Sequence, residues 1–76
     1  MLVTVDWTTY GDMVTIRRRR RKLTQAELAK LIGISRNMIS MIERGATAPS
    51  YAIVMSLSAA LDVDFPPDQP TEGGES

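Results

Sequence analysis

Three neighbouring residues carry the side chains best suited to chemistry in this sequence: Arg36, Asn37 and Met41. An Arg guanidinium can donate two parallel hydrogen bonds to O6 and N7 of guanine, and an Asn amide can pair similarly with N6 and N7 of adenine. An apolar side chain such as that of Met41 can contact the methyl group of thymine. These residue types therefore indicate contact with the edges of nucleic-acid bases.

Two of these side chains have a second interpretation. Arg36 can bind a phosphate instead of a base, because a guanidinium also matches the geometry of phosphate. Met41 can be a spare hydrophobic residue or part of a protein interface, and Met38 in the same segment is expected to be half-buried. For Arg36 we favour contact with a base over contact with a phosphate. Only the base contact predicts that the protein prefers particular DNA sequences.

Catalytic chemistry finds little support in the composition. The 76 residues include no Cys and no His, which excludes disulfides, thiol nucleophiles, zinc fingers and acid–base catalysis by His. The sequence also lacks a Gly-rich phosphate loop and paired carboxylates at metal-ligand spacing. We therefore expect no enzyme activity, no cofactor and no bound metal.

The charged residues are segregated along the chain, although the formal net charge is zero. All nine Lys and Arg lie between Arg17 and Arg44, and residues 1–61 contain four acids, which leaves this part at +5. The other five acids fall in the last fifteen residues, which contain no base. The pattern indicates a basic domain that binds a polyanion. Its acidic tail is expected either to be a solubilising disordered end or to fold back over the basic face.

The sequence carries no sign of membrane insertion or export. No apolar run approaches the roughly 20 residues that span a bilayer, and the N-terminus lacks the charged-then-apolar order of a signal peptide. The absence of Cys fits a reducing compartment. We expect a cytoplasmic protein without a membrane partner.

Two short helices joined by a tight turn are predicted to hold the base-contacting residues. Thr24 and Glu27 form a capping box at the start of the first helix, and Gly33 suits a left-handed cap at its end. Ser35 suits the N-cap of the second helix. Two helices of roughly 8–10 residues around a turn with Gly form a helix-turn-helix. The residues predicted to face inward are Leu28, Ile34, Ile39 and Ile42.

One helix is predicted before this pair and one after it. The first is capped by Thr8 or Thr9 and carries Asp12 in its first turn. It ends in a run of six cations, Arg17–Lys22, which we call the Arg run. The last opens at Ser50 and has more apolar residues than one buried face needs, so some surface is expected to remain for a partner. The chain is thus divided into an N-terminal arm (1–8), a domain (9–65) and an acidic tail (66–76).

The arm has a strand-like alternation, with Val3, Val5 and Trp7 set against Thr4 and Asp6. A single strand is not stable without a partner. The arm is therefore either loosely ordered, with Trp7 packed on the domain, or paired with its copy in a dimer.

The segment Leu23–Gly45 resembles the helix-turn-helix regulators called the XRE family, which include phage repressors and Cro proteins. It reads LTQAELAKLIGISRNMISMIERG and is followed by APS and later by SLSAALDV. The resemblance covers about residues 13–65 and implies a compact all-α, lambda-repressor-like domain of four or five helices. Two features depart from the family pattern. Lys22 stands where members usually carry Gly, and Pro66–Pro67 interrupts the region of the fifth helix.

The resemblance also implies roles for individual residues. Gln25 is expected to contact a phosphate and to brace the recognition helix, and Arg18 is expected to form a salt bridge with Glu43. The residues expected at bases are Arg36, Asn37, Ser40 and Met41. The residues expected at phosphates are Gln25, Ser35, Arg44 and Thr47. Three cations of the run at 17–22, namely Arg17, Arg21 and Lys22, are expected to contact phosphates as well.

These expectations combine into one function. The chain is expected to bind double-stranded DNA as a homodimer on a palindromic operator, with the helix at 36–44 in the major groove. It would act as a sequence-specific transcriptional regulator, in particular a repressor. A phage repressor or Cro, a restriction-modification controller and an antitoxin-type autoregulator all fit. The competing interpretation is a protein-interaction module that uses the N-terminal arm, the Met-rich surface or the tail on a protein partner.

Overall fold

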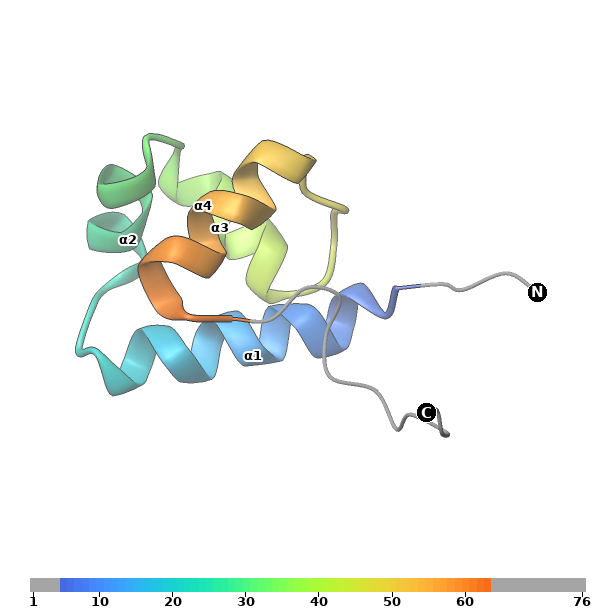
Figure 1. Cartoon of the computed structure of the whole chain (residues 1–76), viewed down its shortest axis with the longest axis horizontal. Helices are drawn as coiled ribbons and strands as arrows, with labels where there is room; N and C mark the ends of the chain where they lie inside the picture. The colour runs from blue at the N-terminus through green and yellow to red at the C-terminus, as the bar shows by residue number, and fades with distance from the viewer. Residues whose placement is uncertain (1–4, 64–76) are drawn as a thin grey trace.

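Four helices and their connections make up residues 5–63, which are the residues described by the computed structural model. They are α1 (Trp7–Arg20), α2 (Gln25–Ile32), α3 (Arg36–Glu43) and α4 (Tyr51–Leu61). The long helix α1 runs along one side of the molecule, and the three shorter helices lie together on the other side of it (Figure 1). The all-α, four-helix prediction is confirmed. The acidic tail, a fifth helix and residues 1–4 of the arm lie outside the described residues.

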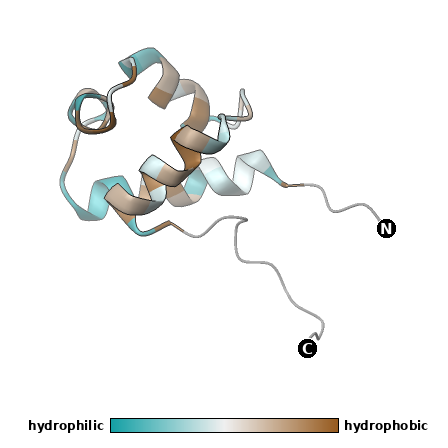
Figure 2. Ribbon diagram, turned by 45° about the horizontal axis from the view of Figure 1, so that its top comes forward, coloured by the Kyte–Doolittle hydropathy of each residue, from teal (hydrophilic) through white to brown (hydrophobic). Residues whose placement is uncertain are grey.

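The core is a single cluster to which every helix contributes. α4 is the most hydrophobic helix, whereas α1 turns hydrophilic toward its C-terminal end (Figure 2). Of the residues predicted to face inward, Leu28, Ile39 and Ile42 are buried and Ile34 packs partly buried against the cluster. Each such large side chain stabilises the fold by about 1.5–3 kcal/mol relative to an exposed one. The buried hydrophobic residues are Tyr10, Val14, Leu28, Ala29, Ile39, Ile42, Val54, Leu57, Leu61 and Val63.

The ends of α2, α3 and α4 follow the local signals in the sequence. The capping box is present: Glu27 N donates to Thr24 Oγ1 at 3.0 Å, and Thr24 N donates to Glu27 Oε1 at 2.8 Å. Gly33 closes α2 with φ of 79°, in the left-handed region. Ser35 and Ser50 accept from the backbone N–H groups three residues on and cap α3 and α4.

The start of α1 differs from the prediction. The N-cap is Asp6 and not Thr8 or Thr9, whose backbone N–H groups instead donate to the Asp6 carboxylate at 3.1 and 3.3 Å. These bonds, led by the Thr9 hydroxyl, hold the pKa of Asp6 below its ordinary value. The earlier start lets the Trp7 ring meet the buried Tyr10 ring edge-on at 5.5 Å. As a result, Asp12 falls outside the first turn, and the last two residues of the predicted arm belong to the helix.

The connection from α1 to α2 contains a strained residue. Lys22 has a φ of 59°, a left-handed conformation that L side chains other than Asn and Asp adopt reluctantly. This is the position at which the family pattern expects Gly. Lys22 therefore adopts the left-handed backbone conformation that a Gly would adopt at this position.

Lys22→Gly is expected to raise the free energy of unfolding by about 0.5–1 kcal/mol, because relief of the left-handed strain exceeds the added entropy of the unfolded chain. Thermal and urea unfolding followed by circular dichroism measure the change. Arg21→Gly is the matched control: Arg21 has a φ of −89°, so its replacement should destabilise. Stabilisation by both changes, or by neither, would contradict the assignment of strain to Lys22.

Candidate nucleic-acid interface

The start of α3 presents polar side chains to solvent on a helix that the core holds in place. Arg36 and Asn37 in its first turn are exposed, as is the cap Ser35, while Ile39 and Ile42 are fully buried. Ser40 and Met41 are half-buried at the side of the exposed face. The helix therefore offers its N-terminal turn outward with its orientation fixed by packing from below. Such a protruding N-terminus suits entry into a major groove.

A buried ion pair ties the end of α3 to α1. Arg18 Nε lies 2.6 Å from Glu43 Oε2, and Arg18 Nη2 donates to Glu43 Oε1 at 3.2 Å. The two side chains are only 10% and 6% exposed. Arg18 Nη1 also donates to the carbonyl oxygen of Leu23 at 2.7 Å, which joins the connection before α2 to the same cluster. The salt bridge that the resemblance implied is thus present.

Gln25 completes this cluster from α2. Its Nε2 donates to Glu43 Oε1 at 3.0 Å, so the first residue of α2 braces the last residue of α3. Burial raises the pKa of Glu43, but the hydrogen bonds from Arg18 and Gln25 and the Arg18 charge outweigh it and hold the pKa below its ordinary value. Glu43 is therefore ionised at neutral pH. The Arg18–Glu43–Gln25 cluster fixes α1, α2 and α3 relative to one another.

The run of cations divides between structure and solvent. Arg18 is buried in the cluster, Arg17 is half-buried, and the residues from Arg19 to Lys22 are exposed. Among residues 5–63 none of the exposed members forms an ion pair, so their charge is available to an anion. Arg44 is exposed at the C-cap of α3, and Thr47 is half-buried in the loop that follows. The predicted phosphate contacts thus lie at both ends of the helix-turn-helix and at the end of α1.

Two glycines allow α1 to approach the end of α3 closely, and the sequence reasoning missed both roles. A Cβ on Gly11 would lie 2.3 Å from the carbonyl oxygen of Ile42 and 2.7 Å from that of Glu43. A Cβ on Gly45, which has a φ of 74°, would lie 2.8 Å from Thr8 Cα. The available signal was Gly11 itself, since Gly within a helix costs about 1 kcal/mol relative to Ala and needs a reason. That reason is the backbone crossing that positions α3.

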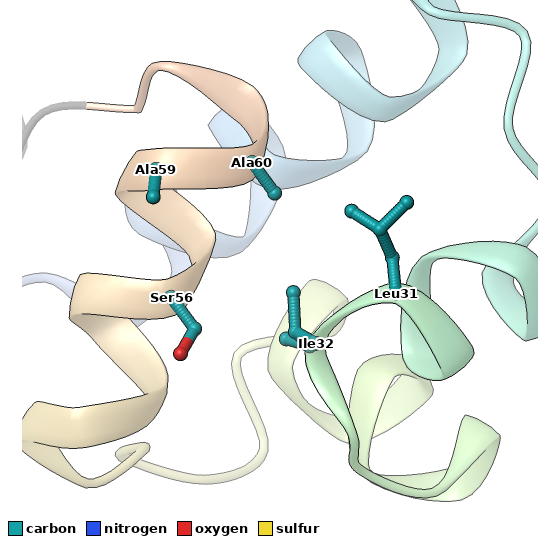
Figure 3. Close-up of a pocket in the computed structure, with 5 residues that line it drawn as sticks. All are labelled: Leu31, Ile32, Ser56, Ala59 and Ala60. Carbon is teal, nitrogen blue, oxygen red and sulfur yellow. The ribbon is translucent and has the colours of Figure 1, made fainter.

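A shallow apolar groove lies away from this charged cluster, between α2 and α4. It has a volume of about 430 Å³. Leu31 and Ile32 line it from α2, and Ser56, Ala59 and Ala60 line it from α4 (Figure 3). Its lining has one hydroxyl group and no charged side chain, so the groove is chemically suited to an apolar contact and not to phosphate.

Metal-binding clusters and membrane-spanning helices are both absent from the part of the chain that the structure describes. Residues 5–63 contain no group of three or more side chains that could hold a metal ion. No helix within those residues is long and apolar enough to cross a membrane.

These features define the class of protein. A buried framework presents a short helix with Arg and Asn at its exposed N-terminus, next to unpaired cations, and this is a helix-turn-helix DNA-binding domain. The sequence model of the helix-turn-helix family matches residues 15–67. The chain therefore belongs to this family, in its XRE branch of phage and bacterial transcriptional regulators.

Three relatives illustrate the likeness. Repressor protein C2 of Salmonella phage P22 is 39% identical over 51 residues, which cover 67% of this chain. The chain spans only 24% of that repressor's length. The ImmF control region 10 kDa protein of Bacillus phage phi105 is 30% identical over 61 residues, or 80% of this chain and 68% of the relative. Among solved structures, the restriction-modification controller protein C.AhdI from Aeromonas hydrophila is 30% identical with a TM-score of 0.72, over 80% of this chain and 92% of that one.

Proposed function

We propose that the chain is a sequence-specific transcriptional repressor that reads the major groove with α3 as a homodimer on a palindromic operator. The observation that carries this proposal is the exposed N-terminal turn of α3 on a buried support, which presents Arg36 and Asn37 to solvent where they can reach base edges. Arg36 pairs with guanine and Asn37 with adenine, while Ser40 and Met41 make the adjoining contacts. Two copies would place their α3 helices about 34 Å apart, on half-sites one turn of DNA apart.

Affinity in this proposal comes mainly from phosphate contacts. Exposed cations and backbone N–H groups at helix N-termini bind phosphates and fix the position of α3 without reading sequence. The residues assigned to phosphates are Gln25, Ser35, Arg44, Thr47, Arg17, Arg21 and Lys22. Such a protein works where the DNA is, which places it in the bacterial cytoplasm. A phage repressor, a restriction-modification controller and an antitoxin-type autoregulator all fit this proposal.

Selection of bound DNA from a random pool, by the parent and by Arg36→Ala and Asn37→Ala, tests this proposal. The parent should enrich a palindrome, and each variant should lose preference at one position per half-site, by about 1–3 kcal/mol. Binding should also weaken with salt by about 0.9 log units per log unit of salt for each phosphate contacted.

Lys30→Ala is the charge-matched control. Lys30 is exposed at the end of α2 and outside the assigned contacts, so its loss should leave every base preference unchanged. A pool from which the parent enriches no motif would reject sequence-specific binding.

One observation favours a second function. The apolar groove between α2 and α4, together with Tyr51 and Met55 at 72% and 48% exposure, offers a surface for a protein partner. A protein-interaction module would use this surface on a protein partner, with Met38 and Met41 of α3 as further apolar side chains. The selection experiment separates the repressor from an interaction module that does not bind DNA, because such a module enriches no operator.

A further inference from the structure

Asn37 and Met41 lie one turn apart on the same face of α3, and their side chains are in contact. Asn37 Nδ2 lies 3.6 Å from Met41 Sδ, within the range of a hydrogen bond to sulfur. Asn37 is exposed, whereas Met41 is half-buried and therefore less mobile. The contact thus joins an exposed polar side chain to a half-buried apolar one.

The chemistry of a primary amide makes this contact compatible with base pairing. The NH₂ group has two hydrogens, one on the side of the amide oxygen and one on the side of Cβ. Pairing with adenine uses the oxygen as acceptor and the oxygen-side hydrogen as donor. The Cβ-side hydrogen points back toward the helix, where it can donate to a sulfur at the i+4 position. The amide can then bind Met41 and a base at the same time.

We propose that Met41 is a positioning residue for base readout by Asn37. Its sulfur holds the amide so that Oδ1 and the second N–H face the DNA, and the side chain is ordered before binding. Ordering in the free protein removes part of the entropic cost that a freely rotating side chain pays on binding. Met41 therefore contributes to the preference at the base that Asn37 reads, separately from any adjoining contact of its own. This inference rests on the proposed function, since it needs Asn37 to read a base.

Met41→Leu tests the inference because Leu has nearly the same volume and no hydrogen-bond acceptor. Affinity is measured for operators with each of the four bases at the position where Asn37→Ala loses its preference. Met41→Leu should reduce the preference there by about threefold, the effect of releasing one side-chain torsion. The preference at the position read by Arg36 should stay unchanged. In the Asn37→Ala background, Met41→Leu should change no preference at that position.

Met38→Leu is the matched control. Met38 is on the same helix but packs against the core, so the same substitution there should alter no base preference. An unchanged preference in Met41→Leu would overturn the inference. A further loss at the position read by Asn37 in the Asn37→Ala background would overturn it too, because Met41 would then act on that base without Asn37.

A measurement without DNA keeps the positioning role separate from operator binding. NMR couplings and amide relaxation of Asn37 should report one side-chain rotamer in the parent and averaging in Met41→Leu, with Met41→Ala as a second variant of the same kind. If Asn37 is as ordered in Met41→Leu and Met41→Ala as it is in the parent, the inference about Met41 is overturned, whereas the proposed function is unaffected. A parent that enriches no motif would instead reject the proposed function, and with it any readout role for Met41.

Discussion

Arg18→Ala is expected to lower the free energy of unfolding by about 3–5 kcal/mol, because it leaves the ionised Glu43 buried without its main partner. It also removes the donor to the Leu23 carbonyl oxygen. A folded chain of 76 residues has a total stability of roughly 4–11 kcal/mol. The substitution should therefore remove a large fraction of the total stability. Urea unfolding at low temperature, followed by circular dichroism, measures the loss.

Arg19→Ala provides the matched control for this substitution. Arg19 is the next residue of α1 and is exposed, so its removal should change the stability by no more than about 0.5 kcal/mol. Equal effects of the two substitutions would show that the buried cluster contributes nothing beyond an ordinary surface charge.

The same cluster should make stability depend on pH. The pKa of Glu43 is lower in the folded protein than its ordinary value of 4.5, so its contribution is complete above that value and is lost as pH falls through the folded pKa. In Glu43→Gln, which cannot ionise, this part of the acid dependence should disappear and the stability at neutral pH should be lower. Unfolding curves at several pH values between 2 and 7 provide the measurement. An identical acid dependence in the parent and Glu43→Gln would contradict this role for Glu43.

Gly11→Ala is the second substitution with a large expected effect. An Ala would gain about 1 kcal/mol of helix propensity, but its Cβ would overlap two backbone carbonyl oxygens at the end of α3. Backbone atoms cannot rotate aside, so α1 and α3 must separate. We expect a net loss of about 2–3 kcal/mol in the free energy of unfolding. Thermal unfolding of the parent and the variant tests this expectation.

Gly33→Ala gives the comparison that separates crowding from backbone strain. A Cβ on Gly33 would meet nothing within 4 Å, but the residue has a φ of 79°. Its replacement should therefore cost only about 1 kcal/mol, from the left-handed conformation alone. A Gly11→Ala variant more stable than the parent would mean that the close crossing of α1 and α3 does not exist in solution.

Stability and DNA binding should respond differently to these substitutions. Arg18 and Gly11 act on the framework, so their variants should lose binding in proportion to the fraction unfolded. Arg36 and Asn37 are exposed, so their variants should lose base preference with little change in the unfolding temperature. Comparing the loss of stability with the loss of base preference therefore distinguishes residues that hold α3 in place from residues of α3 that contact DNA.

The helix-turn-helix was predictable because its signals are local. The capping box, Gly33 and the serine caps act over three or four residues, and the apolar spacing identifies the buried face of α3 without knowledge of the other helices. The start of α1 was predicted wrongly although its cap is also local. Three polar residues stood close together, and what favours Asp6 is the packing of Trp7 on Tyr10 that follows from it.

By itself, the sequence determined the helices around the turn, the exposed polar residues on α3, and the separation of a basic domain from an acidic tail. Local patterns did not determine how α3 is held: the family resemblance implied the Arg18–Glu43 pair, and only the tertiary structure showed its burial and the Gly11 crossing. The Arg18–Glu43 pair joins residues 25 apart, and the Gly11 crossing depends on two backbones meeting, which no local pattern records. It also separated the one Arg of the run that is buried from its exposed neighbours. The physical reason is that a cap depends on adjacent residues, whereas a buried charge or a close crossing depends on the position of a whole helix relative to another.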